Sequence, residues 1–319
     1  DFMLVVDRAL KDGSVDTPDT SSARIPYGVG EMVAASDAMV QVTTLIEQIA
    51  PSDVPILFLG ENGVGKRFAA ETLHGLSRRR EKPFYVVPCT GPSDEQLGRE
   101  LFGYVRGAFD GADEDKDGVF MQAGGGTVLL DEVAGLSKAV QSRISVLMKE
   151  KTLRPIGLNT DIRVDVRILA SSSVDIANEV ARGAFEADLY TRMAAISLDI
   201  PALRERRKDI LPLTRHFIRL LASSSGGARA LSPDARGLLL HHDWPGNVQE
   251  LHGTVQKVLE STTDGVITSK HFPKEIIESL SGKHLVGLSV DTSSGRGIAA
   301  ASFIRSKSAS LPNQSAKPD

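Results

Sequence analysis

The residues with the clearest chemical pattern lie in the segment ILFLGENGVGKR, where Gly60, Gly65 and Lys66 have the G-x-x-x-x-G-K spacing of a P-loop. The apolar run before Gly60 predicts a buried strand, and the residues from Lys66 onward predict a helix. Glycines let backbone N–H groups curl around phosphate oxygens, and a lysine reaches the terminal phosphates as a point charge. The predicted nucleotide-binding residues of this loop are Gly60, Glu61, Asn62, Gly63, Val64, Gly65, Lys66 and Arg67.

An acidic pair, Asp131 and Glu132, ends the aliphatic run in GGGTVLLDEV. In a chain that also has a P-loop earlier in the sequence, such a strand end predicts that Asp131 holds Mg²⁺ and that Glu132 polarises the attacking water. Arg67 stands where Ser or Thr usually holds the metal, which weakens the metal prediction without removing it. The plain alternatives are a glycine-rich turn and a solvated acidic strand end. The strand–loop–helix order favours the nucleotide site.

The elements that position these motifs alternate between strand-like and helix-like segments from Ile25 to about Pro201. The β-rich runs VPILFLG, PFYVVP, TVLLDEV and DVRILASSS are separated by MVQVTTLIEQIA, KRFAAETLHGLS and KAVQSRISVLMKE, whose apolar residues recur at helical spacing. This alternation predicts an α/β fold with a parallel sheet flanked by helices. After Pro201 the strand signal disappears, and a smaller helical domain is expected.

Four regions follow from these patterns. Residues 1–24 are expected to be the end of an upstream domain and a polar linker, and residues 25–201 the α/β nucleotide-binding domain. Residues 202–282 are expected to form the helical domain. Residues 283–319, rich in Ser, Gly, Ala and Lys, predict a disordered tail.

Composition excludes several classes of protein. The 319 residues carry a net charge of −4, without the basic excess of a nucleic-acid module. No helix-turn-helix pattern follows Lys283, so no DNA-binding module is expected in this chain. The single cysteine, Cys89, allows no intramolecular disulfide, and no apolar run approaches the ~20 residues of a membrane span. A cytoplasmic protein is expected.

Four sequence blocks resemble the AAA+ domain of sigma-54-dependent transcription activators, the bacterial enhancer-binding proteins, from about Tyr27 to Leu280. GENGVGKR resembles the family P-loop, and GGTVLLDEV its Walker B strand. FEADLYTRM, IPALRERRKDI and HDWPGNVQEL resemble its arginine-finger, linker and lid segments. ELFGYVRGAFDGA resembles the segment that ends in the GAFTGA loop, the most specific of these blocks. The corresponding partner-loop residues are Gly107, Ala108, Phe109, Asp110, Gly111 and Ala112.

The resemblance implies a hexameric ring with ATP and Mg²⁺ between neighbouring subunits. ATP hydrolysis would move the loop, with Phe109 as its exposed apolar contact, against the sigma-54 RNA polymerase holoenzyme. Arg192 would be an arginine finger and Gln249 would line the nucleotide site from the lid.

This chain departs from the family pattern at residues that, by the resemblance, act in ATP hydrolysis and in its coupling to the loop. Asp110 replaces the threonine of the loop, which places a charge where sigma-54 is contacted. Pro88 replaces an asparagine thought to restrain the Walker B glutamate, and Ser173 replaces the asparagine of the sensor segment. Glu186 replaces the first arginine of the finger pair, and Gln249 replaces the lid arginine.

Three hypotheses remain open. The chain is an ATPase that remodels sigma-54 holoenzyme, or a degenerate regulatory subunit that hydrolyses ATP weakly or not at all. The degenerate subunit would act as a scaffold or in a hetero-oligomeric ring whose normal paralogue supplies the missing arginine. An unrelated AAA+ remodeller is the third hypothesis, and the GAF-x-GA block disfavours it. Retention of Lys66, Asp131 and Glu132 predicts ATP binding with slow hydrolysis.

Overall fold

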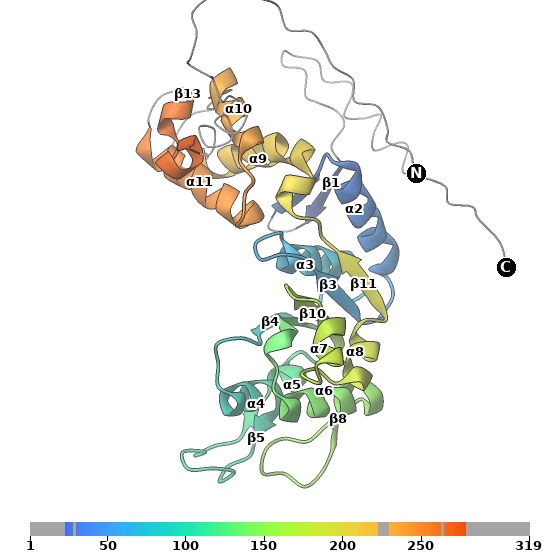
Figure 1. The fold of residues 1–319 in the computed structure, drawn as a ribbon. Helices are drawn as coiled ribbons and strands as arrows, with labels where there is room; N and C mark the ends of the chain where they lie inside the picture. Colours follow the sequence, from blue (N-terminus) through green and yellow to red (C-terminus); the bar gives the residue numbers. More distant parts are fainter. Residues whose placement is uncertain (1–22, 28–29, 223–229, 263–264, 279–319) are drawn as a thin grey trace, which may run out of the picture. The chain divides into compact units, whose positions relative to one another are not determined.

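The computed structural model describes residues 23–27, 30–222, 230–262 and 265–278. The expected linker before residue 23 and the expected tail 283–319 lie outside the described residues, and the domain boundaries stay predictions. A five-stranded parallel sheet has the strand order β11-β3-β10-β7-β4 (Figure 1). Its strands are β3 (Ile56–Leu59), β4 (Phe84–Pro88), β7 (Thr127–Asp131), β10 (Arg167–Ser172) and β11 (Ile196–Asp199).

Helices cover both faces of this sheet, because its central strands are apolar on both sides. Ile56 and Phe58 pack with one buried cluster, whereas Leu57 between them packs with the other. The first cluster lies against α2 (Asp37–Ile49) and α3 (Lys66–Leu76). The second lies against α4 (Asp94–Phe102), α5 (Val119–Gln122), α6 (Lys138–Glu150), α7 (Ile176–Ala181) and α8 (Ala187–Met193). The predicted α/β fold is confirmed.

Two hairpins project from the second layer of helices. The strands β5 (Gly103–Tyr104) and β6 (Lys116–Asp117) pair antiparallel and carry residues 107–112 in the loop between them. The strands β8 (Thr152–Leu153) and β9 (Ile162–Arg163) also pair antiparallel and follow α6. The two hairpins touch, since Val105 N donates to the carbonyl of Ile156 at 3.0 Å.

The smaller helical domain consists of α9 (Ile210–Ala222), α10 (Pro233–His241) and α11 (Asn247–Ser261), with α9 packed against both others (Figure 1). Trp244 is fully buried in its core and donates from Nε1 to the Leu239 carbonyl at 2.9 Å. Ser232 caps α10 by accepting from Ala235 N, and Pro233 occupies the first turn. The predicted lid domain is therefore confirmed as a fold.

Strand prediction failed in five places, two of which are the hairpins β5–β6 and β8–β9. The sheet includes β11, whose residues Ile196–Asp199 follow a helix too closely to form a separate apolar run. An antiparallel pair, β1 (Ala23–Tyr27) and β2 (Gly30–Ala34), precedes α2. The expectation that no strand follows Pro201 is wrong, because β12 (Ala230–Leu231) pairs parallel with β13 (Val266–Ile267). Two residues are too few for a period-2 pattern to be recognised.

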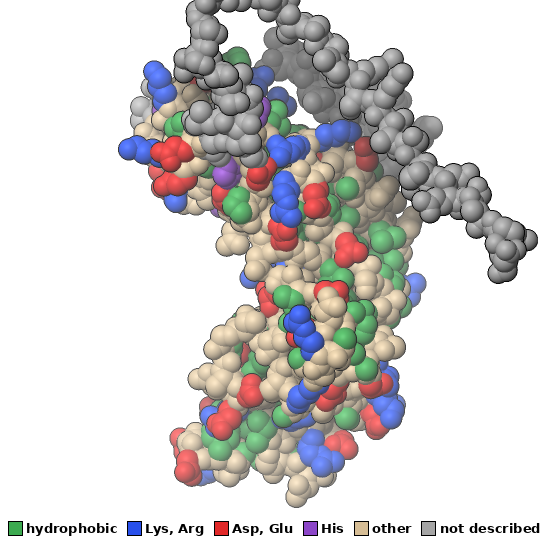
Figure 2. All heavy atoms as spheres, viewed as in Figure 1, with side chains coloured by type: hydrophobic (Ala, Val, Ile, Leu, Met, Phe, Trp, Pro, Cys, Tyr) green, Lys and Arg blue, Asp and Glu red, His purple; other side chains and the backbone are tan. Residues whose placement is uncertain are grey.

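The distribution of charged side chains on the surface agrees with the small net charge of −4. On the face drawn in Figure 2, basic and acidic side chains are interspersed over the described residues. No helix in the described ranges has both the length and the apolar composition needed to cross a membrane.

Candidate functional site

The candidate nucleotide site lies at the carboxyl edge of the parallel sheet. β3 runs into the P-loop, β7 ends at Asp131, and β10 ends at Ser172, in the middle of the sheet. Parallel strands bring all their carboxyl ends to one edge, where ligands bind in open α/β sheets. The fold therefore places segments that are far apart in the sequence around one space.

The P-loop requires glycine at two positions for steric reasons. A Cβ on Gly60, whose φ is +143°, would lie 2.5 Å from the carbonyl oxygen of Ile200. A Cβ on Gly63, whose φ is +77°, would lie 2.3 Å from the carbonyl oxygen of Gly246 in the lid. The backbone therefore passes close to the residue that follows β11 and to the lid.

Lys66 is buried and fully engaged. Its Nζ donates to the carbonyls of Gly60 at 2.7 Å and Glu61 at 3.2 Å. It also forms an ion pair with Glu132 Oε1 at 2.9 Å. Three donors is the capacity of an ammonium group, so a phosphate oxygen must displace one of these partners to bind Lys66.

The acidic pair is fixed by the end of β10. Ser171 Oγ donates to Asp131 Oδ1 and accepts from Glu132 N at 3.0 Å. Glu132 Oε2 accepts from Ser173 N at 2.8 Å and from Ser173 Oγ at 2.7 Å. Burial raises the pKa of Glu132, but the hydrogen bonds from Lys66 and Ser173 outweigh burial and leave its pKa below the ordinary value. Glu132 is therefore an anion at neutral pH.

A magnesium ion fits this donor set. Asp131 borders the pocket, and in the described part of the chain its Oδ2 has no hydrogen-bond donor. Mg²⁺ typically binds one or two carboxylates and takes its other ligands from phosphates and water. The described residues contain no cluster of three or more His, Cys, Asp or Glu side chains suited to a metal. Asp131 would thus hold the ion, which would neutralise phosphate charge.

The lid closes the other side of the site through polar contacts with the P-loop. The buried Asn247 accepts from Leu203 N at 2.8 Å and donates to Glu61 Oε2 at 3.1 Å and the Asn62 carbonyl at 2.9 Å. Arg204 forms a bidentate pair with Glu61, 2.7 Å from Nη1 to Oε2. Hydrogen bonds from Arg204 and then from Asn247 lower the pKa of Glu61 to about 2.

The space between these groups is a pocket of about 590 Å³. Its volume is within the range of small-molecule sites, roughly 300–1,000 Å³. The predicted residues Lys66, Asp131, Glu132 and Gln249 all border it. Arg67 also borders the pocket, although its guanidinium pairs with Glu71 at 2.9 Å and is largely exposed. The remaining lining comes from Asn62, Gly63, Gly65, Phe68, Glu71, Phe217, Val248 and His252.

Comparison with known proteins identifies the family. The family described as Sigma-54 interaction domain matches residues 32–199, more than half of the chain. The chain belongs to this family. The family described as AAA+ ATPase lid domain matches residues 204–286.

Relatives of the sigma-54 interaction domain agree in sequence and fold. The transcriptional regulatory protein ZraR of Salmonella typhimurium is 36% identical over 267 residues, which are 83% of this chain and 59% of ZraR. The Nif-specific regulatory protein of Herbaspirillum seropedicae is 38% identical over 247 residues, 77% of this chain and 46% of that protein. The structure of NtrX from Brucella abortus in complex with ATP has a TM-score of 0.73 at 31% identity, covering 81% of this chain and 59% of NtrX. The chain thus spans 59% of the length of ZraR.

The segment predicted to carry the arginine finger of this sigma-54 interaction domain is held by α6 of the same chain. Arg192 pairs with Asp188 through two contacts, of 2.9 and 3.0 Å, and Asp188 also accepts from Ser145 Oγ at 2.6 Å. Glu186, at the first finger position, accepts from Ser142 Oγ. Arg192 does not border the nucleotide pocket of its own chain.

The partner loop, residues 107–112, is folded against its own hairpin. Gly107 N donates to the Ala112 carbonyl at 2.8 Å, and the φ angles of Gly107 and Gly111 are +78° and +94°. The expectation that Phe109 is exposed is wrong, since the side chain is half-buried. The Arg99 guanidinium lies 3.6 Å above the Phe109 ring, which also forms a T-shaped pair with the Tyr104 ring at a centroid distance of 4.8 Å. Asp110 is exposed at the tip.

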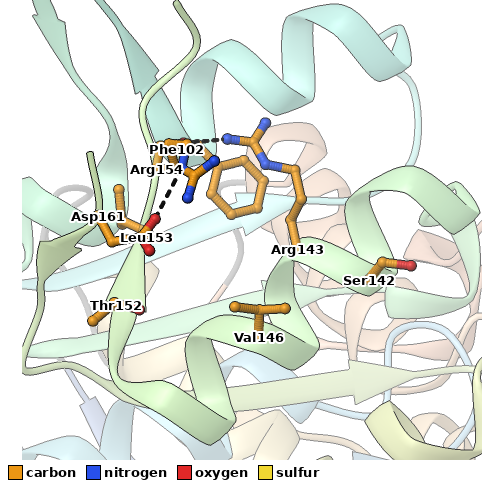
Figure 3. Close-up of a pocket in the computed structure, with 8 residues that line it drawn as sticks. All are labelled: Phe102, Ser142, Arg143, Val146, Thr152, Leu153, Arg154 and Asp161. Atoms are coloured by element: carbon orange, nitrogen blue, oxygen red, sulfur yellow. Dashed lines mark hydrogen bonds and ion pairs between the residues drawn. The ribbon is translucent and has the colours of Figure 1, made fainter. Parts of the chain in front are cut away.

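A second pocket, of about 340 Å³, lies at the base of the two hairpins (Figure 3). In it the Arg143 guanidinium of α6 stacks 3.7 Å above the Phe102 ring and donates to the Arg154 carbonyl at 2.6 Å. Arg154 in turn pairs with Asp161 at 2.9 Å. These contacts connect α6 and the end of α4 to the β8–β9 loop, so the two hairpins share one anchored base.

Two functional features escaped the sequence analysis. Ser171 was not among the predicted site residues, although it contacts both acidic residues. Asn247 was not predicted to bind the P-loop. Arg204 and Arg206 were likewise not predicted to contact the P-loop, and the structure connects them to Glu61 and to the Val64 carbonyl. No local pattern marks such pairs, because the acidic partners of Ser171 lie 39 and 40 residues away and the P-loop partners of Asn247, Arg204 and Arg206 more than 140.

Proposed function

We propose that this chain is the ATP-binding AAA+ part of a transcription regulator that remodels sigma-54 RNA polymerase holoenzyme through ATP binding and hydrolysis. The observation that carries the proposal is the grouping of Lys66, Asp131 and Glu132 around one pocket beneath the lid. The relatives support it, since the NtrX structure contains ATP. Lys66 would bind the terminal phosphates, and Asp131 would hold Mg²⁺.

Hydrolysis would use Glu132 to orient the attacking water and accept its proton. Arg192 would act in the pocket of a neighbouring subunit, because it does not border its own. The proposal therefore includes a ring, either a hexamer or a hetero-oligomer. To act in trans, the Arg192 guanidinium must leave Asp188.

The direct test of this proposal is ATP turnover by the whole chain with Mg²⁺, compared with Glu132→Gln. We expect slow turnover that falls at least about 100-fold in Glu132→Gln, while ATP still binds. Equal rates in the two proteins would refute hydrolysis at this site.

A degenerate regulatory subunit is the second candidate function. Glu186 supports it, because an acidic side chain bonded to α6 occupies the first finger position. Asp110 supports it as well, because its exposed negative charge replaces the threonine with which the family contacts sigma-54. A sigma-54 pull-down with a trapped transition-state analogue distinguishes the two. Binding by the wild type supports remodelling, whereas binding only after Asp110→Thr supports the degenerate subunit.

A further inference from the structure

The second pocket, at the base of the two hairpins, contains a basic side chain without an acidic partner. Arg143 extends from α6 over the Phe102 ring, and Val146 follows it one turn later on the same helix (Figure 3). Arg143 Nη2 donates to the Arg154 carbonyl at 2.6 Å, whereas Nε and Nη1 donate to no group of the described residues. No carboxylate in the described part of the chain pairs with this guanidinium.

A half-buried guanidinium without a counter-ion favours binding of an anion from outside the chain. Burial lowers the pKa of Arg143, because the pocket solvates the cation less well than water does. Arginine nevertheless stays protonated at neutral pH, so the positive charge remains in the pocket. Carboxylates and phosphates are the groups whose oxygens match the planar arrangement of its N–H donors.

The walls of the pocket limit which anion fits. Phe102 and Leu153 are buried apolar side chains, and Val146 is 52% exposed at the rim. Asp161, the acidic side chain among the lining residues, pairs with Arg154 at 2.9 Å, which reduces its repulsion of an anion. Apolar walls beside one cation favour a singly charged carboxylate on an apolar body over a more strongly hydrated phosphate. The volume of about 340 Å³ is sufficient for a small molecule of this kind.

We propose that this pocket binds a small monocarboxylate with an apolar body, and that the ligand stabilises the base of the partner loop. The carboxylate would accept from the N–H groups that Arg143 has left after its bond to Arg154. The apolar body would lie against Val146 and Leu153. Binding at this pocket requires neither ATP nor sigma-54, so it is separate from the proposed function.

The effect on the partner loop follows from the position of the pocket. It joins α6, the end of α4 and the β8–β9 hairpin, and α4 leads directly into β5, which carries the loop. In the absence of ligand, Arg143 holds this base through one hydrogen bond to the Arg154 carbonyl. A ligand bound to Arg143 and packed on Leu153 would add a second connection between α6 and β8.

The test titrates the full chain with benzoate and with benzamide, which has nearly the same shape but no charge. Benzoate should bind with a Kd on the order of 1 mM, about tenfold more tightly than benzamide, because charge-assisted hydrogen bonds to Arg143 require the anion. Arg143→Met should weaken benzoate binding by about the same factor. Calorimetry measures all three, and equal Kd values for benzoate and benzamide would overturn the inference.

A second variant keeps the test decisive if Arg143→Met disturbs the fold. Val146→Phe adds a ring at the exposed rim and leaves Arg143 and its hydrogen bond in place, so it should fill the pocket and weaken benzoate binding about tenfold. Leu220→Phe, a similar change at an exposed apolar residue of the lid, should keep the wild-type affinity. Equal affinity of Val146→Phe and the wild type for benzoate would place the benzoate outside this pocket and refute the site.

An acidic side chain of a neighbouring chain is the other source of a carboxylate. In that case Arg143→Met would reduce self-association of the chain in sedimentation, and benzoate would not bind the wild type. No saturable binding of benzoate up to about 20 mM would therefore overturn the proposal of a small-molecule site.

Hydrogen exchange tests the effect on the base of the loop. The Val105 amide donates to the Ile156 carbonyl at 3.0 Å and so joins the two hairpins. It should exchange about threefold more slowly with benzoate bound, because opening of the hairpins becomes less frequent. The Gln249 amide of the lid, bonded to the Gly63 carbonyl at 3.2 Å, should keep its rate. Unchanged exchange at Val105 in the presence of bound benzoate would overturn the second part of the proposal.

Discussion

At the scale of single residues, the charge of the nucleotide pocket depends on a few side chains. Lys66 is the buried cation of the P-loop, and it is shared with Glu132. On the lid side Gln249 borders the same pocket and contributes a neutral amide. An amide donates hydrogen bonds to a phosphate but cannot neutralise its charge. Nucleotide affinity should therefore respond to a new charge at Gln249.

Gln249→Arg should tighten ATP binding about fivefold, equivalent to roughly 1 kcal/mol, because a guanidinium adds charge-assisted bonds to the phosphates. ADP should gain less, about twofold, if the residue faces the terminal phosphate. Calorimetric titration of both nucleotides measures this difference. Gln256→Arg, on the same helix but paired with Glu260, is the control and should leave both affinities unchanged. Equal gains for ATP and ADP would place residue 249 elsewhere in the pocket.

At the scale of elements, the joint between the lid and the P-loop is polar rather than apolar. Glu61 accepts from Arg204 and Asn247, and Arg206 donates to the Val64 carbonyl at 2.7 Å. Asp209 accepts from Ala35 N and Ser36 N, both at 2.6 Å, and so connects the lid to the start of α2. The contacts of Glu61 depend on its ionisation, so this part of the joint should weaken in acid.

The Glu61 carboxyl has a pKa of about 2 in the folded chain, below its ordinary value of 4.5. Its contribution to stability is therefore complete above pH 4.5 and is lost as the pH falls toward 2. Between pH 6 and pH 3, the melting temperature of the wild type should fall about 2 °C more than that of Glu61→Gln. The loss is small because the ion pair is partly exposed and screened by solvent.

Thermal melts across this range, read by circular dichroism, measure the effect. Glu95→Gln is the control, since Glu95 pairs with Arg99 on the surface of α4. If the melting temperatures of Glu61→Gln and the wild type fall equally between pH 6 and pH 3, the ionised Glu61 does not stabilise the joint between the lid and the P-loop.

At the scale of the whole molecule, the proposed active site is incomplete in one chain. Lys66, Asp131, Glu132 and Gln249 border the pocket, whereas Arg192 lies on α8, paired with Asp188. A ring would bring Arg192 of one subunit to the pocket of the next. Two inactive variants with different defects should then complement each other.

Arg192→Ala and Glu132→Gln should each lose ATP turnover alone. In an equal mixture, roughly a quarter of the interfaces combine an intact Glu132 with an intact Arg192, so about that share of wild-type turnover should return. Mixing Glu132→Gln with Lys66→Ala provides the control, because both defects lie in the same pocket and each faces an intact Arg192. No recovery in the first mixture would refute the action of Arg192 in trans.

The sequence by itself determined the class of fold and the P-loop, because these depend on local spacing. Gly60, Gly65 and Lys66 have a fixed interval, and the strands and helices around them have their own periods. The strand β11 was missed because it follows a helix too closely to form a separate apolar run, and the pair β12–β13 because two residues are too few for a period to be recognised.

Only the tertiary structure decided which side chains meet. It placed Ser173 on Glu132 and Asn247 on Glu61, and it covered Phe109 with Arg99. Each of these contacts depends on where parallel strands and packed helices bring distant segments together. Hydrogen bonds and ion pairs act over about 3 Å, so the pairings follow from the packing of the fold and not from the spacing of residues along the chain.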